Sequence, residues 1–209
     1  MFWIKILIPV FISRISCRAP VDIRAAMKAH RIIPDVLDNA PEDMIEVMWE
    51  DGILADFGNQ INMVQTLSEP LMVNWPTGVM GYYTMYYTLL MIDADYEVNQ
   101  TTNSTDNDHH KRPTRPERPE WRHWLKGNIQ GSLILTGQTI DEYVPPYPVD
   151  NKGLHRYVFI LFLQKRSMTF HEVHRDVNDP HRGNFSTREF MRKYNFSEPV
   201  AINFFKADS

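Results

Sequence analysis

The sequence contains little of what several protein classes require. Among its 209 residues there is a single cysteine, Cys17, which excludes an intramolecular disulfide. Glycine is scarce at nine residues, whereas there are fourteen prolines, five tryptophans, nine tyrosines and eleven phenylalanines. Aromatic side chains favour strands and proline favours rigid loops. The composition therefore predicts a mainly β fold.

An excess of charge of one sign is also missing. The chain has 26 acidic and 22 basic residues, which give a formal net charge of -4. This mild balance provides no electrostatic basis for binding nucleic acid. With 43% hydrophobic residues the chain can fill one substantial core, and its length favours one domain. We expect a single-domain protein, monomeric and without a nucleic acid partner.

Common catalytic motifs are absent from the sequence. It lacks Gly-x-Ser-x-Gly, His-Glu-x-x-His and a glycine-rich phosphate loop. His171 and His174 have the spacing of a zinc pair, but no obvious third ligand accompanies them. We expect a polar surface turn at these histidines, and a protein that is not an enzyme and holds no metal or cofactor.

The N-terminus has the features of an export signal. Lys5 precedes an apolar run at residues 6–12 that is too short to span a membrane, and small residues follow. We predict that residues 1–19 are a signal peptide and that residues 20–209 form one secreted domain. The alternative is an apolar extension on a cytoplasmic protein. Glycosylation sequons compatible with secretion occur at Asn99, Asn103, Asn184 and Asn195.

The most informative stretch begins at His155. His155 and Tyr157 are two residues apart and would share one face of a strand. Apolar residues at 158–163 continue both faces, which is typical of a buried strand. Burying an imidazole at the mouth of such a strand is costly unless a partner hydrogen-bonds it. This strand mouth is the first candidate for a functional site.

A second strand is predicted to bring acidic side chains to its end. The run from Tyr82 to Ile92 is rich in Tyr, Thr and Leu, and its tyrosines and threonines favour a strand. Its odd-numbered face continues to Asp93 and Asp95. We expect these two carboxylates to emerge together at the end of a core strand.

Polar residues at 96–119 then interrupt the pattern. This proline-broken segment cannot bury enough surface to order itself, so we expect a solvated loop. After the loop, extended geometry would set Trp121, His123 and Leu125 on one face of a further strand.

Other elements are predicted from capping and turn signals. Asp22 can cap a short helix that ends before Pro34. Residues 44–49 and 61–64 have the composition of strands. Residues 186–189 form a capping box, and the phenylalanines around it would form a hydrophobic staple.

Several short motifs follow one another along the chain. They are Asp93-Ala94-Asp95, Trp121-Arg122-His123-Trp124-Leu125, Asn128-Ile129-Gln130-Gly131, Tyr143-Val144-Pro145-Pro146-Tyr147-Pro148, Gly153 to Phe159 and Pro199-Val200-Ala201. Together they resemble the phosphatidylethanolamine-binding protein family, from about residue 22 to the C-terminus. The resemblance is to a secreted, insect-like member with a shortened C-terminus.

This resemblance implies an antiparallel β-sandwich with a few peripheral helices. It also implies a small anion-accepting pocket at the strand ends that binds phosphate-bearing head groups. Members of the family act chiefly as binding or regulatory proteins, including kinase-pathway and protease inhibitors. The family's pocket corresponds here to Asp93, Asp95, Trp121, His123, His155 and Tyr157.

The chemistry of these residue types suits such a ligand. Imidazole and phenol groups donate to phosphate oxygens, and a carboxylate orients an imidazole. Trp121 would shield these contacts from water and can face a cationic ammonium. Arg156, on the opposite face of its strand, is expected to be a structural ion-pair partner for a carboxylate. The alternative for His123 and His155 is that they are buried core histidines without a ligand.

The sequence also departs from the family's pattern. Ala94 and Glu97 stand where the pattern Asp-Pro-Asp-x-Pro has prolines, and Val149 replaces another. Residues 96–119 are interpreted as an insertion beside the pocket. The chain stops soon after Ala201, without the C-terminal helix of many animal members. We expect a less rigid pocket rim and weaker ligand binding.

Three function classes remain at this point. The leading one is non-enzymatic binding of a small phosphate-bearing or anionic ligand. The second is an inhibitor of a protein partner, of kinase-pathway or serine-protease type, acting through the pocket rim and the insertion. The third is an enzyme that uses the carboxylates and histidines for acid–base or metal chemistry, which the missing motifs disfavour.

Overall fold

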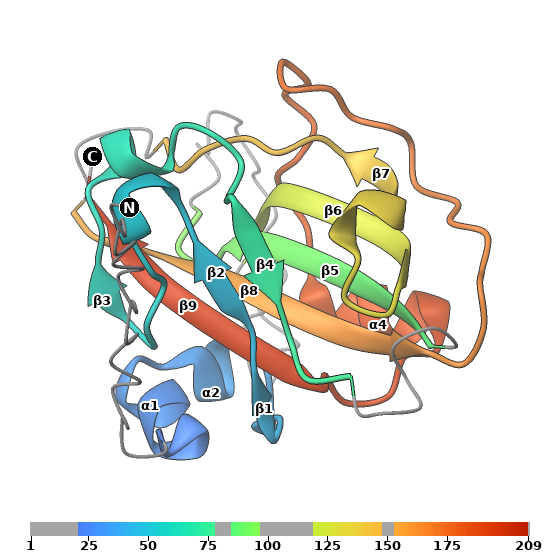
Figure 1. Cartoon of the computed structure of the whole chain (residues 1–209), viewed down its shortest axis with the longest axis horizontal. Coiled ribbons are helices and arrows are strands. Elements are labelled where there is room, and N and C mark those ends of the chain that lie inside the picture. Colours follow the sequence, from blue (N-terminus) through green and yellow to red (C-terminus); the bar gives the residue numbers. More distant parts are fainter. Residues whose placement is uncertain (1–20, 78–84, 97–118, 148–152, 209) are drawn as a thin grey trace, which may run out of the picture.

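The structure, a computed structural model, describes residues 21–77, 85–96, 119–147 and 153–208. Its main element is a seven-stranded sheet with the order β1-β9-β8-β5-β6-β7, in which β3 also pairs with β9 (Figure 1). A two-stranded sheet pairs β2 with β4. The strands are β1 Asp43–Met44, β2 Glu46–Met48, β3 Asn59–Gln60, β4 Met72–Asn74, β5 Tyr86–Asp93, β6 Trp121–Gln130, β7 Gln138–Asp141, β8 His155–Gln164 and β9 Ala201–Ala207.

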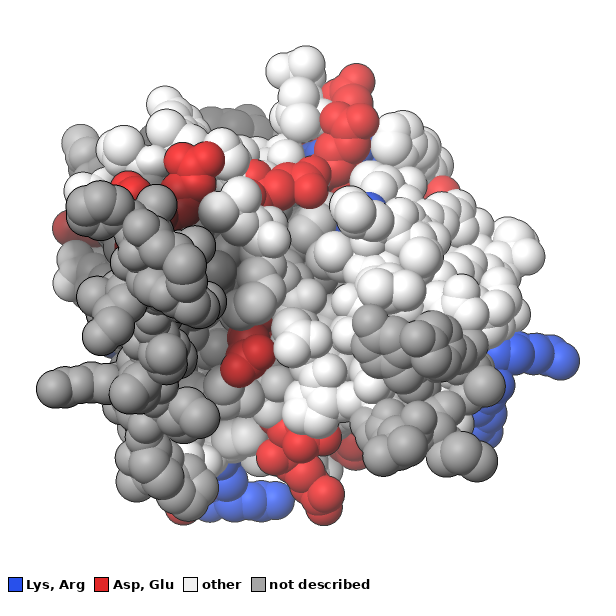
Figure 2. Space-filling view, in the orientation of Figure 1, with Lys and Arg blue, Asp and Glu red and all other residues white. Residues whose placement is uncertain are grey.

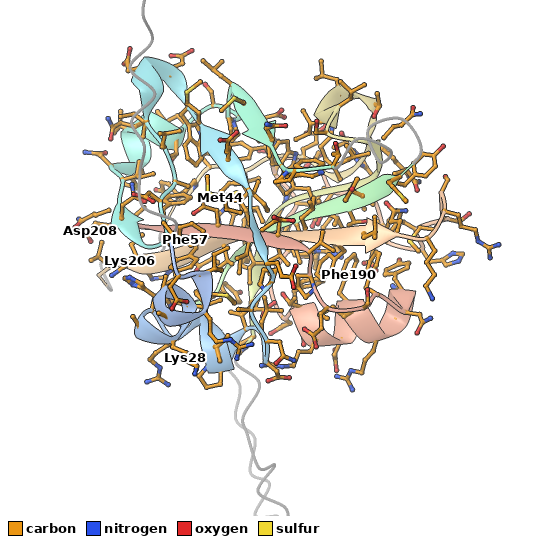
Figure 3. The ribbon with its side chains drawn as sticks, turned by 60° about the horizontal axis from the view of Figure 1, so that its bottom comes forward. Lys28, Met44, Phe57, Phe190, Lys206 and Asp208 are labelled. Carbon is orange, nitrogen blue, oxygen red and sulfur yellow. The ribbon has the colours of Figure 1, made fainter. Side chains whose placement is uncertain are left out.

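Helices and short 3-10 turns complete the described fold. They are α1 Ile23–Ala29, α2 Ile32–Asp35, η1 Glu50–Gly52, η2 Met63–Thr66, η3 Ile134–Thr136 and α4 Thr187–Tyr194. The small sheet covers one face of the large sheet, and the helices lie on the other (Figures 1 and 3). Among the residues described, no helix has the length and apolar character needed to cross a membrane.

Two hydrophobic cores lie on the two faces of the large sheet. One core joins Val47 and Val73 of the small sheet to Met91 and Phe159. The other joins residues such as Phe190 of α4 to the opposite faces of β5, β8 and β9. The prediction of a mainly β fold is confirmed. The central strands are antiparallel, whereas β1 and β3 run parallel to β9.

Strand β8 is buried on both faces, as its sequence predicts. Tyr157, Phe159 and Leu161 belong to the core under the small sheet, while Val158 and Ile160 belong to the core under the helices. Residues 157–164 of β8 pair with β5 and residues 155–161 pair with β9, so most backbone hydrogen bonds of this buried strand lie within the sheet.

The predicted helix caps are confirmed. The side chain of Asp22 accepts a hydrogen bond from the backbone N–H of Ala25 at 2.9 Å. At the start of α4, Ser186 accepts from the N–H of Glu189 at 3.3 Å. The rings of Phe185 and Phe190 lie 5.6 Å apart across this cap, which is the expected hydrophobic staple.

Two strand predictions are wrong in detail. The stretch 44–49 is divided between β1, which pairs with β9, and β2, which pairs with β4, because the chain passes from one sheet to the other. Residues 61–64 are not a strand, since η2 begins at Met63. The side chain of Asn62 accepts from the N–H of Val64 at 3.0 Å, and this local bond competes with strand pairing.

Some predictions fall outside the described residues. They concern the signal peptide at 1–19, the core of the polar insertion with Asn99 and Asn103, and the altered rim positions Glu97 and Val149. On the face that carries the small sheet, Figure 2 shows scattered acidic side chains, with basic ones near the margins. The part of this face that is described thus carries no basic patch suited to nucleic acid.

Candidate functional site

The sheet register brings the predicted site residues to one end of the sheet. Asp93, the last residue of β5, pairs with Tyr157 of β8 on one side and with Trp121 of β6 on the other. His155, the first residue of β8, pairs with Ala207 near the end of β9. This end of the sheet lies near the C-terminus in Figure 1.

Asp93 and His155 form a buried hydrogen-bonded pair. The Nδ1 of His155 donates to Oδ2 of Asp93 at 2.7 Å, and the two residues are 7% and 5% exposed. The contact uses one ring nitrogen of His155 and fixes the orientation of the ring. The second nitrogen, Nε2, accepts a hydrogen bond when the ring is neutral and donates when it is protonated.

A β-bulge in β6 brings His123 to the same face. Met91 of β5 pairs with Trp124, but its neighbour Ile92 pairs with Arg122, so His123 is the extra residue of β6. The ring of His123 lies 4.5 Å from that of Trp121 and 5.0 Å from that of Tyr157. Bulges of this kind redirect side chains next to binding sites.

The same bulge corrects the prediction for Leu125. We expected Leu125 to share a face with Trp121 and His123. Instead Leu125 belongs to the core under the helices, whereas Trp124 belongs to the core under the small sheet. One inserted residue shifts the alternation by one position and exchanges the faces of the residues that follow, until a second register shift before Ile129 restores the original alternation.

His123 is neutral in this environment. Burial lowers the pKa of His123 to about 4, although the nearby carboxylate of Asp93 acts in the opposite direction. Its Nδ1 donates to the carbonyl oxygen of Val144 at 2.8 Å. In the neutral ring the other nitrogen, Nε2, is therefore a hydrogen-bond acceptor.

Tyr157 carries an unsatisfied polar group at this end of the core. The residue is fully buried, and its hydroxyl has no hydrogen-bond partner among the described residues. Burial, together with the charge of Asp93, raises the pKa of Tyr157 far above its usual value, so the hydroxyl keeps its proton. A buried hydroxyl without a partner costs about 1–3 kcal/mol, which a bound ligand can recover.

Asp95 is not on the face expected for it. Strand β5 ends at Asp93, and a turn carries the carboxylate of Asp95 to the guanidinium of Arg156, at 2.6 Å between Oδ1 and Nη2. Burial alone would raise the pKa of Asp95, but hydrogen bonds from Arg156 hold it below its usual value. The expected structural role of Arg156 is confirmed, and a ligand-binding role for Asp95 stays a prediction.

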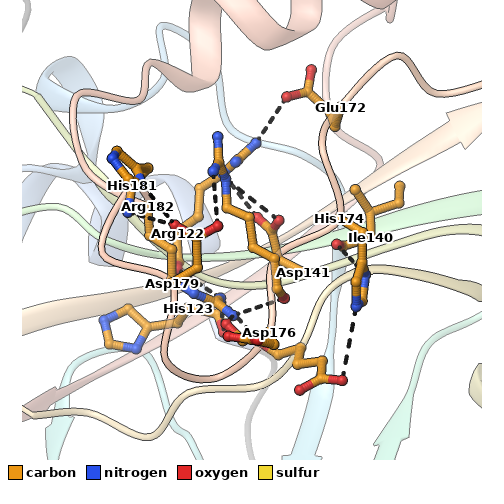
Figure 4. Close-up of polar contacts among 12 residues, drawn as sticks. Arg122, His123, Ile140, Asp141, Glu172, His174, Asp176, Asp179, His181 and Arg182 are labelled. Carbon is orange, nitrogen blue, oxygen red and sulfur yellow. Dashed lines mark hydrogen bonds and ion pairs between the residues drawn. The ribbon is translucent and has the colours of Figure 1, made fainter.

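Arg182 and its neighbours were not singled out from the sequence (Figure 4). Arg182 is fully buried and donates to the carbonyl oxygens of residues 122, 123, 142, 175 and 176. Its guanidinium also lies 5.6 Å from the ring centroid of Trp121. The available sequence signal was the run Asp179-Pro180-His181-Arg182-Gly183, in which proline and glycine indicate a turn around an arginine.

Ion pairs and a hydrogen bond join β6, β7 and the same loop. Arg122 lies 2.9 Å from Asp141 and 3.1 Å from Glu172, measured between the closest nitrogen and oxygen atoms. His174 donates through Nδ1 to the carbonyl oxygen of Ile140 at 3.0 Å. In the part of the chain described, no three His, Cys, Asp or Glu side chains are arranged to hold a metal ion.

Known proteins resemble this chain over most of its length. A family model described as phosphatidylethanolamine-binding protein matches residues 58–205. Putative odorant-binding protein A5 of Drosophila melanogaster is 27% identical over 187 residues, which cover 89% of this chain and 80% of that protein. The 26 kDa secreted antigen of Toxocara canis is 27% identical over 179 residues, covering 85% of this chain and 61% of the antigen.

Solved structures share the fold. A phosphatidylethanolamine-binding protein from Plasmodium vivax superposes with a TM-score of 0.65 at 22% identity, over 88% of this chain and 96% of that chain. The carboxypeptidase Y inhibitor, complexed with its cognate proteinase, gives a TM-score of 0.64 at 20% identity, over 88% and 94% of the two chains. At these identities the similarity concerns the fold alone.

Proposed function

The chain belongs to the phosphatidylethanolamine-binding protein family, and we propose that it binds a small phosphate-bearing or otherwise anionic ligand where β5, β6 and β8 end. The site consists of Asp93, His123, His155 and Tyr157, with Trp121 as one wall. It acts by binding and not by catalysis, in line with the names of its odorant-binding and antigen relatives.

The hydroxyl of Tyr157 is the observation that carries this proposal. It is buried, protonated and without a partner in the described residues, so it offers a donor that a phosphate oxygen would satisfy. When protonated, the ring of His155 donates through both nitrogens, one to Asp93 and the other to the ligand. The neutral His123 accepts from a ligand group that carries a proton, such as an ammonium.

Removing only the hydroxyl of Tyr157 tests the proposal. Calorimetry with phosphoethanolamine should give binding heats for the natural chain and a loss of affinity of about tenfold for Tyr157→Phe, because a hydrogen bond to a charged group is lost. The free energy of unfolding without ligand should stay equal or rise by about 1 kcal/mol, since the variant removes an unsatisfied buried group.

Tyr143 provides a matched control. It is buried in the same core, but its hydroxyl donates to the carbonyl oxygen of Thr66 at 2.7 Å. Tyr143→Phe should therefore lower the free energy of unfolding by about 1 kcal/mol and leave ligand affinity unchanged. Equal binding heats for the natural chain and Tyr157→Phe, or no heats at millimolar phosphoethanolamine, would reject the proposal.

We further propose that the chain is secreted. A relative is named as a secreted antigen, and the N-terminal sequence has the pattern of a signal peptide. Expression in eukaryotic cells should deliver the protein to the medium with its N-terminus near residue 20. Intracellular protein that retains Met1 would contradict secretion.

Inhibition of a protein partner is the second candidate. It is favoured by the fold shared with the carboxypeptidase Y inhibitor. In this case the chain should slow peptide hydrolysis by carboxypeptidase Y, and a variant without residues 97–118 should lose the effect if the insertion contacts the partner. Unchanged protease activity at micromolar chain would exclude inhibition of carboxypeptidase Y without bearing on ligand binding.

A further inference from the structure

The turn after β5 is fastened to the start of β8. The backbone N–H of Ala94 donates to the carbonyl oxygen of Arg156 at 2.9 Å, and the N–H of Arg156 donates to Oδ2 of Asp95 at 3.0 Å. Within the turn, the N–H of Asp95 donates to Oδ1 of Asp93 at 2.8 Å. The carboxylate of Asp93 is thus held by the turn through one oxygen and by His155 through the other.

The side chain of Arg156 holds this turn from the face of the sheet that carries the helices. Its Nε and Nη2 donate to the two oxygens of Asp95 at 2.8 and 2.6 Å, the two-pronged geometry that guanidinium and carboxylate favour. Its Nη1 donates to the carbonyl oxygen of His30 at 3.0 Å and to Asp35 at 3.2 Å. Because Arg156 is only 10% exposed as a side chain, water competes little for these bonds.

No proline restrains this turn. Its sequence is Asp93-Ala94-Asp95-Tyr96, so the backbone dihedral of Ala94 is not fixed by a ring. The ion pair between Arg156 and Asp95 then restrains the turn through charge-assisted hydrogen bonds, which are stronger than neutral ones.

We propose that Arg156 is a positioning residue: acting through Asp95, it fixes the carboxylate of Asp93 against Nδ1 of His155 and so keeps Nε2 of that ring turned toward the ligand. Arg156 makes no contact with the ligand in this arrangement. The part of the proposal that concerns ligand affinity rests on the proposed function, whereas the state of the His155 ring does not.

Several charged or titratable groups surround His155. They are Asp93 at the end of β5, Asp95 in the turn after it, His123 of β6, Arg156 and Tyr157 of β8, and Lys206 of β9, while β9 places the uncharged Ala207 directly opposite His155. Changing any of these charges alters the electrostatic environment of His155 through space. The test therefore measures which ring nitrogen of the neutral imidazole carries the proton, because the position of this proton reports the contact with Asp93 more directly.

Asp95 and Asp35 form a matched pair for the test, since each is a carboxylate partner of Arg156 but only Asp95 belongs to the turn. Nitrogen-15 NMR at alkaline pH should find the Nδ1–H form of His155 in the natural chain and in Asp35→Ala. In Asp95→Ala and Arg156→Gln we expect a mixture with the Nε2–H form. Affinity for phosphoethanolamine should fall about tenfold in these two variants and stay within about twofold in Asp35→Ala.

Asp95→Asn extends the test if Asp95→Ala does not fold. Its amide oxygen still accepts from the N–H of Arg156, so a smaller fraction of the Nε2–H form is expected. An Nδ1–H form that persists in every Asp95 and Arg156 variant, or the same mixture in Asp35→Ala, would overturn the proposal. If the natural chain binds no phosphoethanolamine while the NMR differences appear, the proposed function fails and the positioning role stands.

Discussion

His123 illustrates how burial sets the charge of a side chain at the end of the sheet. Burial lowers its pKa to about 4, and the bond from Nδ1 to Val144 keeps the neutral ring in one orientation. In the unfolded chain the same imidazole titrates near the ordinary value of about 6.5. Between these two pH values the unfolded state binds a proton that the folded state does not.

A pH-dependent loss of stability follows from this difference. Above about pH 6.5 the ring of His123 is neutral in the folded and the unfolded state, and its titration costs no stability. As the pH falls toward 4, the free energy of unfolding decreases by at most about 3 kcal/mol. Denaturant unfolding at a series of pH values measures this loss. His123→Asn, whose amide can donate to Val144 without titrating, should reduce the slope of stability against pH in this interval. The same slope in both proteins would contradict a buried neutral His123.

The bulge in β6 and the loop around Arg182 act as one structural element. An extra residue in a strand leaves backbone groups out of the regular ladder. Arg182 donates to the carbonyl oxygens of Arg122 and His123, the two residues at the bulge, at 3.3 and 3.4 Å. Figure 4 shows Arg182 beside Arg122 and His123. The same guanidinium also lies over the ring of Trp121, so the loop supports both residues of β6 assigned to the site.

Arg182→Lys should therefore be strongly destabilising. An ammonium cannot replace a planar guanidinium that reaches five carbonyl oxygens, so we expect the free energy of unfolding to fall by about 3 kcal/mol in denaturant titrations. Arg192→Lys on the exposed side of α4 is the control and should change the free energy of unfolding by less than about 0.5 kcal/mol. Equal effects of the two substitutions would show that Arg182 does not support the bulge.

Helix α4 has a glycosylation sequon at each end. Asn184 and Asn195 are exposed and have φ values of 55° and 51°. We expect both to carry glycans when the chain passes through the secretory route, detected as a mass lost after treatment with peptide N-glycosidase. Ser197→Ala removes the second sequon without changing Asn195, and should abolish one glycan. A secreted chain of unchanged mass would contradict this expectation.

Strand periodicity predicted the parts of the site that lie within regular strands. His155 and Tyr157 share a face because β8 is regular, and the capping signals of α1 and α4 are local. Periodicity failed for Asp95, which lies beyond the end of β5, and for Leu125, which follows the bulge. Both deviations depend on contacts with distant residues, such as Arg156 and Arg182, that local sequence does not reveal.

For the molecule as a whole, the site lies where the layers meet. Strands β5 and β8 separate the two cores, and the ends of these strands carry the buried polar groups of Asp93, His155 and Tyr157. The site therefore depends on both layers: the small sheet covers the face that holds Tyr157, and α1 and α2 supply contacts for Arg156.

The intact chain is expected to be a monomer. In the described sheet the outermost strands β1 and β7 have two and four residues, and such short edges offer few backbone groups for pairing between molecules. Light scattering should give a mass near the 24.6 kDa of the full sequence, reduced by any cleaved leader. A mass twice as large at micromolar concentration would contradict this expectation.

Electron density from a crystal grown with phosphoethanolamine would be the most direct test of the binding site. We predict a phosphoryl group within hydrogen-bonding distance of the Tyr157 hydroxyl and Nε2 of His155, with Trp121 beside it. A crystal in which the ligand binds elsewhere, or in which a side chain of the protein itself occupies the space next to the Tyr157 hydroxyl, would contradict the proposal.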